Sequence, residues 1–510
     1  MIRGVDPSTY SLWDTREAFG LPFFNANRQG LDTNIVNRSV LRTPCARMRL
    51  SRLSTSPMLK KIASYFRKDP LPILPGEPHT IPSGDHPISP RQITSGAKKV
   101  VEQLVSDGYE AYLVGGCVRD LLLGMQPKDF DVATDATPEE VNRLFRRARI
   151  IGRRFQIVHV RMGKEVIEVT TFRASHTAEH KGRDQSRRSS KGLLLRDNIF
   201  GSVTEDACRR DFTMNALYYH PQDNSVFDYA DGLSDIQQRL IRVIGNAEER
   251  YREDPVRMLR AVRFAAKLGF RIEENSARAI GKLGHLLADI PPARLFDEVL
   301  KLLMHGHALA TFRLLREFGL FKLLFPATEE ALSKDPGYYL EFLEQAMTNT
   351  DKRIRADKRV TPAFLLGAIL WPAVLERRKA FESGNSSPVY ALQQAAGEVV
   401  HRACQRISIP RRFSMPMREI WELQLRLPRR AGTQASRLME NNRFRAGYDF
   451  LLLREDAGEI EPGLGEWWTR FQEANEHARE EMTSNLDQPK SRRRRRRPSK
   501  RPSSPQGDHD

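Results

Sequence analysis

The sequence predicts an α+β protein, in which a small mixed sheet comes first and an all-helical region follows. Between residues 111 and 172, short apolar runs and alternating apolar and polar runs recur, as in half-buried strands. From residue 267 to about 427, apolar residues recur at helical spacing, for example over 295–303 and 363–370. The length of 510 residues is too great for one core, so several domains are expected.

Shifts in composition along the chain predict five segments. They are a disordered N-terminal extension with a Pro-rich linker over residues 1–90, a head with the sheet over 91–235, a helical neck over 236–300, a helical body over 301–480, and a disordered Arg-rich tail over 481–510.

Composition restricts the partners and the compartment. The net charge of +18 favours a polyanionic partner, nucleic acid before an anionic membrane surface. Cys45, Cys117, Cys208 and Cys404 are far apart and lack Cys-x-x-Cys spacing, which argues against a disulfide framework or a zinc site and fits a reducing cytoplasm. No apolar run approaches the length of about 20 residues that spans a bilayer.

The first motif begins at Ala111. Residues 111–114 are apolar and predict a buried strand, Gly115 and Gly116 turn the backbone, and residues 117–123 have helical spacing, with Gly124 as the helix cap. A Gly-Gly turn leaves backbone N–H groups accessible, which suits a triphosphate.

An acidic pair follows this helix. In the run Asp129-Phe-Asp-Val, side chains on a strand repeat with period two, so Asp129 and Asp131 are expected on the same face. Two carboxylates so close repel each other unless a cation lies between them, and Mg²⁺ prefers such oxygen ligands. An isolated Asp-x-Asp more often caps a turn or faces solvent, so the motif is informative only together with the Gly-Gly turn and the helix.

That succession resembles the nucleotidyltransferase head of the polymerase beta superfamily. The stretch from Leu113 to Asp131 resembles the subclass shared by bacterial poly(A) polymerases and CCA-adding enzymes, although Cys117 stands where a third glycine is frequent. The resemblance implies that Asp129 and Asp131 hold two Mg²⁺ ions, with Mn²⁺ as an alternative. It also implies that three residues seat the triphosphate of ATP: Gly115, Gly116 and Arg119.

A second motif distinguishes between the two families. Arg153 and Arg154 lie in the segment Ile150-Ile-Gly-Arg-Arg-Phe-Gln-Ile-Val-His-Val160, where composition alone permits a solvated corner. The segment resembles one that marks bacterial poly(A) polymerases and is absent from typical CCA-adding enzymes. We therefore assign both arginines to RNA binding.

Two residues compete for the place of a third catalytic acid. Glu168 lies in an alternating strand, Glu165–Phe172, and is either an acid beside the Asp pair or a solvent-facing residue. Asp211 precedes Phe-Thr-Met-Asn and on local pattern is a helix N-cap. The string Arg209-Arg-Asp-Phe-Thr-Met-Asn-Ala-Leu217 matches a family motif. The match implies that Asp211 is a catalytic acid and that Arg210 and Asn215 help to bind the nucleotide. On this resemblance we favour Asp211 as the third acid. Glu168 stays the rival, because both side chains could lie within reach of Asp129 and Asp131.

A third motif lies in the predicted neck. In Glu253-Asp-Pro-Val-Arg-Met-Leu-Arg260, the residues Asp254, Arg257 and Arg260 fall at helical steps, which on spacing alone predicts an ordinary intrahelical ion pair. The string resembles the family's neck motif, which implies that these side chains bind the edge of the incoming base, so that protein replaces a template.

The C-terminal part is expected to bind RNA nonspecifically. Its tail contains six consecutive arginines, namely Arg492, Arg493, Arg494, Arg495, Arg496 and Arg497.

Together these resemblances imply template-independent addition of AMP from ATP to RNA 3′ ends by a two-metal mechanism, a modification that promotes RNA decay in this family. The alternative is a CCA-adding tRNA nucleotidyltransferase with the same head and neck. A catalytically dead RNA-binding head is disfavoured because Asp129, Asp131 and Asp211 are all present, and a membrane-surface protein is disfavoured because no large apolar face is evident. The expected partners are RNA 3′ ends, ATP and RNA-decay proteins, and the protein is expected to be a monomer.

Overall fold

The computed structural model describes residues 77–152, 156–174, 186–188, 194–197, 200–384, 386–484 and 486. The chain divides into two units, residues 1–68 and 69–510. The first unit lies outside the described residues, so the description below concerns the second. The Arg-rich tail and most of the N-terminal extension also lie outside the described residues.

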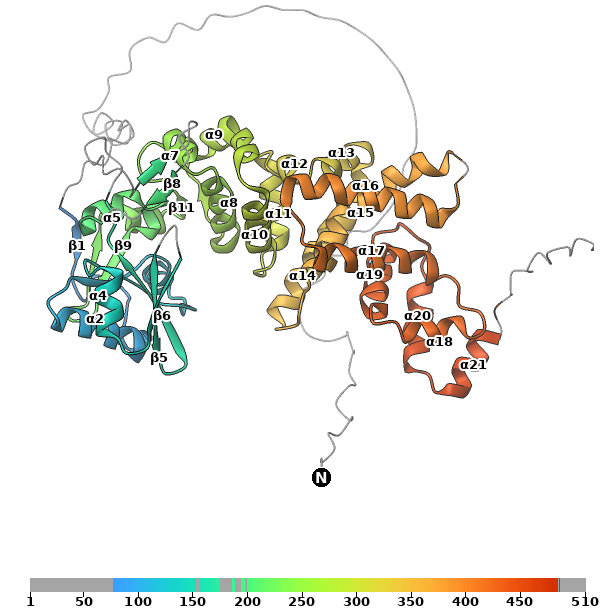
Figure 1. Cartoon of the computed structure of the whole chain (residues 1–510), viewed down its shortest axis with the longest axis horizontal. Helices are drawn as coiled ribbons and strands as arrows, with labels where there is room; N and C mark the ends of the chain where they lie inside the picture. The colour runs from blue at the N-terminus through green and yellow to red at the C-terminus, as the bar shows by residue number, and fades with distance from the viewer. Residues whose placement is uncertain are drawn as a thin grey trace, which may run out of the picture. The chain divides into compact units, whose positions relative to one another are not determined.

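The head is built on an eight-stranded mixed sheet with the order β1-β10-β9-β2-β3-β6-β5-β4 (Figure 1). Neighbouring strands are antiparallel except β3 and β6, which are parallel. The strands are β1 His79–Ile81, β2 Ala111–Val114, β3 Asp131–Thr134, β4 Ala148–Ile151, β5 Ile157–Met162, β6 Glu165–Thr171, β9 Leu217–His220 and β10 Ser225–Asp228. A separate hairpin joins β7 Ser186–Arg188 to β8 Leu194–Asp197.

Helices cover one face of this sheet. They are α2 Ser95–Ser106, α3 Gly116–Leu122 and α4 Pro138–Leu144. Their apolar residues, such as Val100 and Val141, form a core with Leu113, Val132 and Ile167 from the strands. The opposite face carries a smaller cluster around Tyr218 and Phe172, against which α5 Val203–Arg209 packs through Ala207.

Local sequence explains where these helices begin. Thr137 caps α4 through the backbone N–H of Glu140, whose carboxylate accepts a hydrogen bond from the backbone N–H of Thr137. Thr94 caps α2 in the same position. Gly115 precedes α3 with φ +71° and ψ −122°, a conformation that L side chains rarely adopt, so the turn depends on glycine.

The neck and body are helical, which confirms the predicted α+β class. The neck contains α6 Gly232–Gln237, α7 Ala247–Glu253, α8 Val256–Leu268, α9 Glu274–Leu283 and α10 Pro292–Leu303, with the short parallel strands β11 Leu240–Ile241 and β12 Arg271–Ile272. The body contains α11 Ala308–Glu317, α12 Phe321–Leu324, α13 Pro326–Lys334, α14 Pro336–Arg355, α15 Pro362–Glu382, α16 Pro388–Ile407, α17 Arg411–Arg426, α18 Gln434–Met439, α19 Phe444–Asp456, α20 Leu464–Glu473 and α21 Glu476–Ser484. Three 3₁₀ turns, Pro90–Gln92, Thr213–Asn215 and Gly284–Asp289, complete the described elements.

The structure departs from the sequence-based expectations in three places. The expected linker contains β1, an edge strand that tolerates Pro78 and Pro82 at its ends because an edge strand leaves one side unpaired. The acidic strand begins at Asp131, so Asp129 lies in the bend before it. Ile150 and Ile151, expected in the turn that opens the segment Ile150–Val160, belong instead to the edge strand β4.

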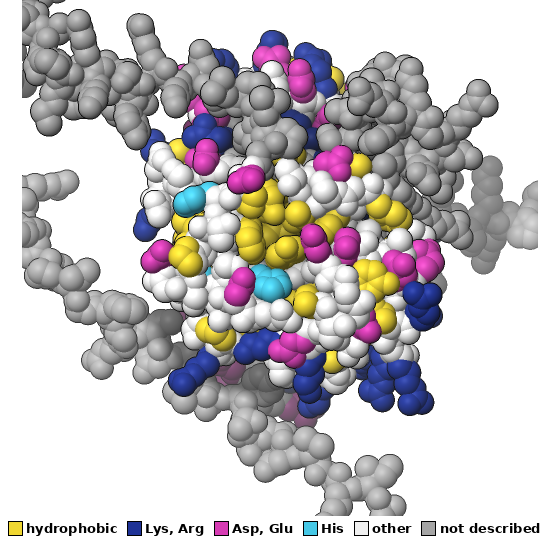
Figure 2. Space-filling model, turned by 90° about the vertical axis from the view of Figure 1, so that its left-hand side faces the viewer, with side chains coloured by type: hydrophobic (Ala, Val, Ile, Leu, Met, Phe, Trp, Pro, Cys, Tyr) yellow, Lys and Arg dark blue, Asp and Glu magenta, His cyan; other side chains and the backbone are white. Residues whose placement is uncertain are grey.

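The surface and the helices add two observations. Figure 2, seen from the left-hand side of Figure 1, shows apolar and acidic side chains in the middle of that face and most Lys and Arg towards its margins. The described residues of this face therefore present no continuous basic surface to a polyanion. Among the helices that the structure describes, none combines the length and the apolar character that crossing a bilayer requires.

Candidate active site

The catalytic candidates meet where β3 pairs with β6. The parallel register places Asp131 directly opposite Glu168, and Asp129 lies two residues before Asp131. Burial, together with the charges of Glu168 and Asp129, raises the pKa of Asp131 to about 6 against the opposing effect of Arg210. A pKa raised in this way means that the surroundings of Asp131 do not fully compensate the negative charge of its ionised carboxylate.

This cluster suits a divalent cation. Glu168 is 48% exposed, and among the described residues it pairs with His159, at 3.4 Å between Nε2 and Oε1. Its side chain is therefore free to rotate towards Asp131. Among the described residues, no three His, Cys, Asp or Glu side chains are already gathered as metal ligands. The acidic donors fit Mg²⁺ in kind, because it binds through one or two carboxylates together with substrate phosphates.

The Gly-Gly turn lies against Arg210. A Cβ atom at Gly115 would lie 3.1 Å from Nη1 of Arg210, whereas one at Gly116 would meet only Nη2 of Arg119 at 3.6 Å. The positive φ of Gly115 and this close approach both require glycine there. The turn and a guanidinium thus line the same space, where a phosphate would find donors from both.

A buried carboxylate that sequence reasoning missed holds Arg210 in place. Asp206 is 2% exposed and accepts hydrogen bonds from Nη2 of Arg209 at 2.8 Å, Nη2 of Arg210 at 3.0 Å and the Tyr218 hydroxyl at 2.7 Å. Burial alone would raise the pKa of Asp206, but the two arginines hold it well below its usual range. Its position three and four residues before the two arginines was the signal in the sequence.

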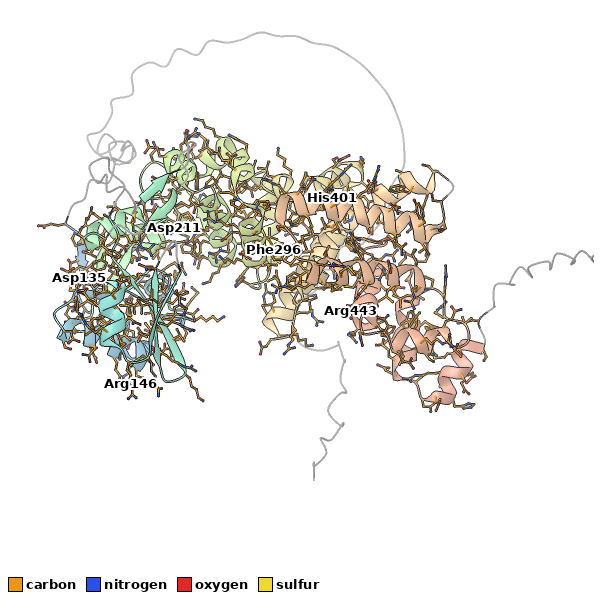
Figure 3. The ribbon with its side chains drawn as sticks, in the orientation of Figure 1. Asp135, Arg146, Asp211, Phe296, His401 and Arg443 are labelled. Atoms are coloured by element: carbon orange, nitrogen blue, oxygen red, sulfur yellow. The ribbon has the colours of Figure 1, made fainter. Side chains whose placement is uncertain are left out.

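Asp211 belongs to a different network. Its Oδ2 accepts a hydrogen bond from Nε of Arg260 at 2.8 Å, and its Oδ1 accepts one from Nδ2 of Asn215 at 3.1 Å. Although burial raises the pKa of Asp211, the Arg260 charge and the Asn215 bond lower it to about 2. Figure 3 labels Asp211, which the Arg260 contact ties to helix α8 of the neck.

Arg119 is turned inwards. It is 3% exposed, and it donates from Nε to Asp120 at 2.8 Å and from Nη1 to the side-chain oxygen of Asn215 at 2.7 Å. Its guanidinium lies 5.2 Å from the ring centroid of Phe264 on α8. Arg119 therefore fixes the orientation of Asn215, whose amide donates to Asp211.

Two of the three base-recognition candidates, Asp254 and Arg257, do not pair with each other. Asp254 lies between α7 and α8, where it accepts a hydrogen bond from Nη2 of Arg294 at 2.8 Å. Arg257 donates from Nη1 to Glu253 at 3.1 Å and to the carbonyl oxygen of Arg250 at 2.7 Å. The expected alternative, an Asp254–Arg257 ion pair, is absent from these contacts because the chain breaks its helix at Asp254.

A second residue missed from the sequence joins the neck to the head. Nη2 of Arg250 on α7 donates to the carbonyl oxygens of Arg209 and Arg210, the latter at 2.6 Å. The segment that carries Asp211 is thus bound to α7 by its backbone. No sequence pattern signals such a bond, because the acceptors are main-chain atoms.

Several predicted RNA-binding residues lie outside the described residues. They are Arg153, Arg154, Arg492, Arg493, Arg494, Arg495, Arg496 and Arg497.

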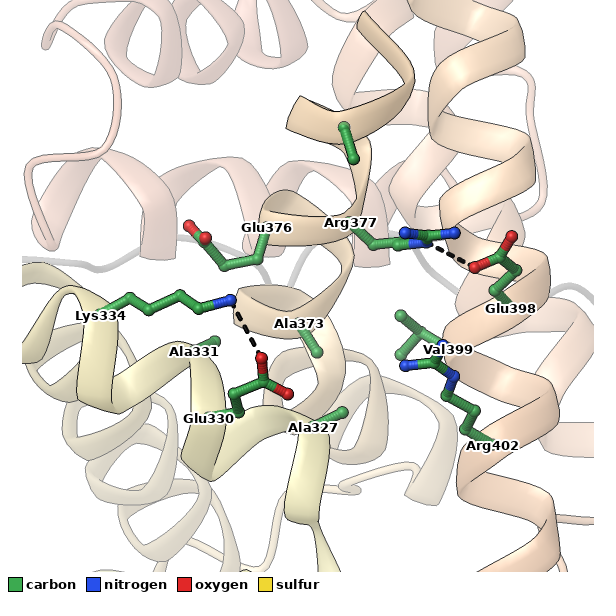
Figure 4. Close-up of a pocket in the computed structure, with 11 residues that line it drawn as sticks. Ala327, Glu330, Ala331, Lys334, Ala373, Glu376, Arg377, Glu398, Val399 and Arg402 are labelled. Atoms are coloured by element: carbon green, nitrogen blue, oxygen red, sulfur yellow. Dashed lines mark hydrogen bonds and ion pairs between the residues drawn. The ribbon is translucent and has the colours of Figure 1, made fainter. Parts of the chain in front are cut away.

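The body contains a cavity of a different kind (Figure 4). Its volume is about 210 Å³, and α13, α15 and α16 line it. The acids there are ion-paired: Glu330 with Lys334 at 3.0 Å, and Glu398 with Arg377 at 2.5 Å. An apolar floor with neutralised acids offers no chemistry comparable to that around Asp131.

Three family descriptions match the chain. Residues 111–242 match "Poly A polymerase head domain", residues 269–332 match "Probable RNA and SrmB-binding site of polymerase A", and residues 384–501 match "Polymerase A arginine-rich C-terminus".

Curated relatives carry two names. The chain is 49% identical to poly(A) polymerase I of Salmonella typhimurium, across 82% of this chain and 92% of that protein. It is 46% identical to poly(A) polymerase I of Haemophilus influenzae, across 79% of this chain and 90% of that protein. It is 39% identical to the CCA-adding enzyme of Lactiplantibacillus plantarum, across 49% of this chain and 60% of that protein.

Solved structures share the architecture. The Bacillus stearothermophilus CCA-adding enzyme in complex with CTP aligns with a TM-score of 0.51 at 27% identity, covering 75% of this chain and 82% of that one. A CCA-adding enzyme in apo form I aligns with a TM-score of 0.52 at 21% identity, across 77% and 85%, which shows the fold alone.

Proposed function

The chain belongs to the family of bacterial poly(A) polymerases, and we propose that it adds AMP from ATP to RNA 3′ ends without a template. The observation that carries this proposal is the extent of the similarity. Relatives named poly(A) polymerase I match 82% of the chain, whereas the CCA-adding relative matches 49%. The arginine-rich C-terminus also has its own family description.

The family implies dependence on a divalent metal, and Mg²⁺ is the ion that we propose, with Mn²⁺ as an alternative. Asp129, Asp131 and Glu168 would hold it. When bound, such ions lower the pKa of the attacking 3′-hydroxyl and neutralise charge on the leaving pyrophosphate. The raised pKa of Asp131 supports this role, because a bound cation would offset both the burial and the repulsion from neighbouring carboxylates that raise it.

The phosphates of ATP would bind at the Gly115–Gly116 turn beside Arg210. Asp206 and Tyr218 hold Nε and Nη2 of Arg210, which leaves Nη1 directed towards Gly115. A guanidinium fixed on one edge presents its other edge to an anion with little loss of side-chain entropy.

The sugar and base of ATP would bind at the junction of head and neck. We assign this task to Asn215 and Arg260, both oriented by Asp211, and to Asp254 and Arg257. Because Arg257 and Asp254 are bonded to Glu253 and Arg294, a base would have to exchange with these partners. Arg119 would act on the nucleotide through Asn215.

We propose Glu168 as the third catalytic acid in place of Asp211, which the sequence favoured. Two observations support this: Glu168 is the strand neighbour of Asp131, and the Asp211 carboxylate is occupied by Arg260 and Asn215. Asp211 would then be a positioning residue.

A pair of variants tests that assignment. Glu168→Gln should lower kcat while leaving the KM for ATP within about twofold. Asp211→Asn should mainly raise the KM for ATP, because Arg260 and Asn215 lose their common acceptor. The reverse pattern would restore Asp211 as the third acid.

The partners follow from the activity. RNA 3′ ends and ATP would be the substrates. Residues 269–332 match a description that names RNA and SrmB binding, which supports a protein partner for the helical region; that it is an RNA-decay protein stays an expectation from the sequence. We further propose cytoplasmic localisation and a monomer, as expected from the sequence.

The decisive experiment is primer extension with Mg²⁺ and either ATP or CTP. One RNA ends in an unstructured oligoadenylate, and the other is a tRNA trimmed of its CCA end. Long, heterogeneous, ATP-dependent tails should form on the first RNA, and the Asp129→Asn/Asp131→Asn double variant should abolish them. Addition that uses CTP and stops after three nucleotides on the trimmed tRNA would identify a CCA-adding enzyme instead.

A further inference from the structure

A row of charged side chains crosses the sheet from the acidic cluster to its edge. The registers place Glu168 of β6 opposite Asp131 of β3, His159 of β5 opposite Glu168, and Arg149 of β4 opposite His159. Directly paired residues point to the same face of a sheet. The row spans three strand spacings, about 14 Å, since neighbouring strands lie about 4.8 Å apart.

Side chains on both sides of this row are exposed. Arg161 lies opposite Val166, which is 44% exposed, and Ile151 at the edge is 41% exposed. Arg149 and Arg161 are exposed too, and neither guanidinium has a hydrogen bond or ion pair within the part of the chain that the structure describes. Two unpaired guanidiniums among exposed apolar side chains are unusual for a strand face without a partner.

The opposite face of the same three strands is closed. Val158, Val160 and Ile167 point there and belong to the core beneath α2 and α4. Strands β4, β5 and β6 therefore have one packed face and one open face that carries arginine and apolar residues. We define the open face by Arg149, Ile151, His159, Arg161 and Val166.

We propose that this open face binds the 3′-terminal nucleotides of single-stranded RNA, with the hydroxyl end at Asp131 and the preceding phosphates at Arg149 and Arg161. The proposal rests on the function proposed above, because that function puts the 3′-hydroxyl at the acidic cluster. The charges are arranged as this orientation requires, with acids on β3 and β6 at the reacting end and guanidiniums farther away on β5 and β4.

The chemistry of the face fits single-stranded RNA of any sequence. Arginines bind phosphates through paired N–H donors, and the apolar side chains Ile151 and Val166 offer contact to ribose and base faces. The face has few groups that would read base edges, so it would accept any 3′ end. A template-independent polymerase needs such tolerance.

The test compares two double variants that remove equal charge. Arg149→Gln/Arg161→Gln alters the open face. Lys99→Gln/Arg143→Gln alters exposed positions of α2 and α4, which cover the opposite face. Binding of a fluorescein-labelled oligoadenylate is measured by anisotropy over a range of salt concentrations, together with the KM values for RNA and ATP and the thermal unfolding of each variant.

The open-face variant should bind the oligoadenylate about ten- to thirtyfold more weakly at 0.1 M salt. The slope of log affinity against log salt should fall by about 1.4, since each phosphate contact on a single strand contributes about 0.7. The KM for RNA should rise in parallel, while the KM for ATP and the unfolding temperature stay unchanged. Equal losses in both variants, or no loss in the open-face variant, would overturn the proposal.

A crosslink tests the location without any substitution. An oligoadenylate with 4-thiouridine near its 3′ end should crosslink to peptides from residues 148–162, and a crosslink confined to the helical body would contradict the proposal. Both measurements report binding alone. They therefore remain informative if the primer-extension assay finds no polymerisation, which would overturn the proposed function separately.

Discussion

The head and the helical body differ in where their charged side chains lie and how these side chains are paired. In the head, Asp206 and Arg119 are almost completely buried, and each is fixed by two or more charged or polar partners. In the body, most pairs, such as Arg313–Glu344, lie at the surface, and Arg454–Glu459 is a buried exception. The interior is filled by large apolar side chains, including Trp371 and Trp421. Charge in the head sets the geometry of a site, whereas charge in the body mainly keeps helices in water.

This difference has an energetic meaning. A buried carboxylate is retained only with strong partners, because desolvation disfavours its ionised form. Asp206 and Asp211 have such partners, and their pKa values are lowered. Asp131 lacks sufficient compensation, and its pKa is raised. Asp131, whose charge is not fully compensated, is thus the residue that we propose as a ligand of the cation.

The largest expected effect on stability comes from Asp206. Asp206→Asn leaves Arg209 and Arg210 short of a buried counter-charge and should cost about 3–5 kcal/mol. In the body, Glu344→Gln removes an exposed pair and should cost less than about 1 kcal/mol.

Hydrogen exchange and tryptophan fluorescence can separate the two regions, because Trp371, Trp421, Trp467 and Trp468 all lie in the body. Asp206→Asn should lower amide protection in β9 and α5 first. If Glu344→Gln destabilises the protein as much as Asp206→Asn does, the contrast between the regions is wrong.

Replacing Asp131 should change stability in the opposite direction to replacing Asp206. Its pKa of about 6 in the folded protein lies above the usual 3.8, so the wild-type protein should lose stability as pH rises from about 4 to 6. Asp131→Asn should abolish activity yet stabilise the metal-free protein at pH 7.5 by up to about 3 kcal/mol.

Denaturant unfolding in EDTA measures this gain. Added Mg²⁺ should stabilise the wild-type protein more than the variant, because the ion binds the ionised carboxylates. A variant less stable than the wild-type protein in EDTA would show that Asp131 is not electrostatically strained.

Asp211 should make the head sensitive to acid. Its pKa is lowered to about 2, so its contribution is complete above pH 4 and is lost as pH falls from about 4 to 2. The loss should be about 2 kcal/mol. The free energy of unfolding should therefore depend less on pH over this range in Asp211→Asn than in the wild-type protein. The same pH dependence in both proteins would contradict the pairing with Arg260.

The smallest expected effect distinguishes two glycines with the same φ of +71°. Gly115→Ala places a Cβ 3.1 Å from Nη1 of Arg210, whereas Gly124→Ala meets nothing within 4 Å. Each should lose about 1 kcal/mol of stability through backbone strain. Only Gly115→Ala should also raise the KM for ATP, and equal kinetics in the two variants would exclude the turn from phosphate binding.

The sequence by itself determined the α+β class, the Gly-Gly turn, the acidic pair and the helical neck and body. These are local properties: alternation, helical spacing, glycine at a turn and the Thr137 cap all act over a few residues. Glu168 was found as a candidate in the same way, since its strand alternates as predicted, with Ile167 and Val169 buried and Val166 and Glu168 exposed.

Only the tertiary structure decided which candidates meet. The parallel pairing of β3 with β6 brings Glu168 beside Asp131, while Arg260 on α8 occupies Asp211. Arg119 turned out to face Asn215, and β1 joined the sheet from a stretch expected as linker. Strand register and the partner of a buried charge depend on chain segments far apart in sequence, and no local pattern encodes which segments pack together.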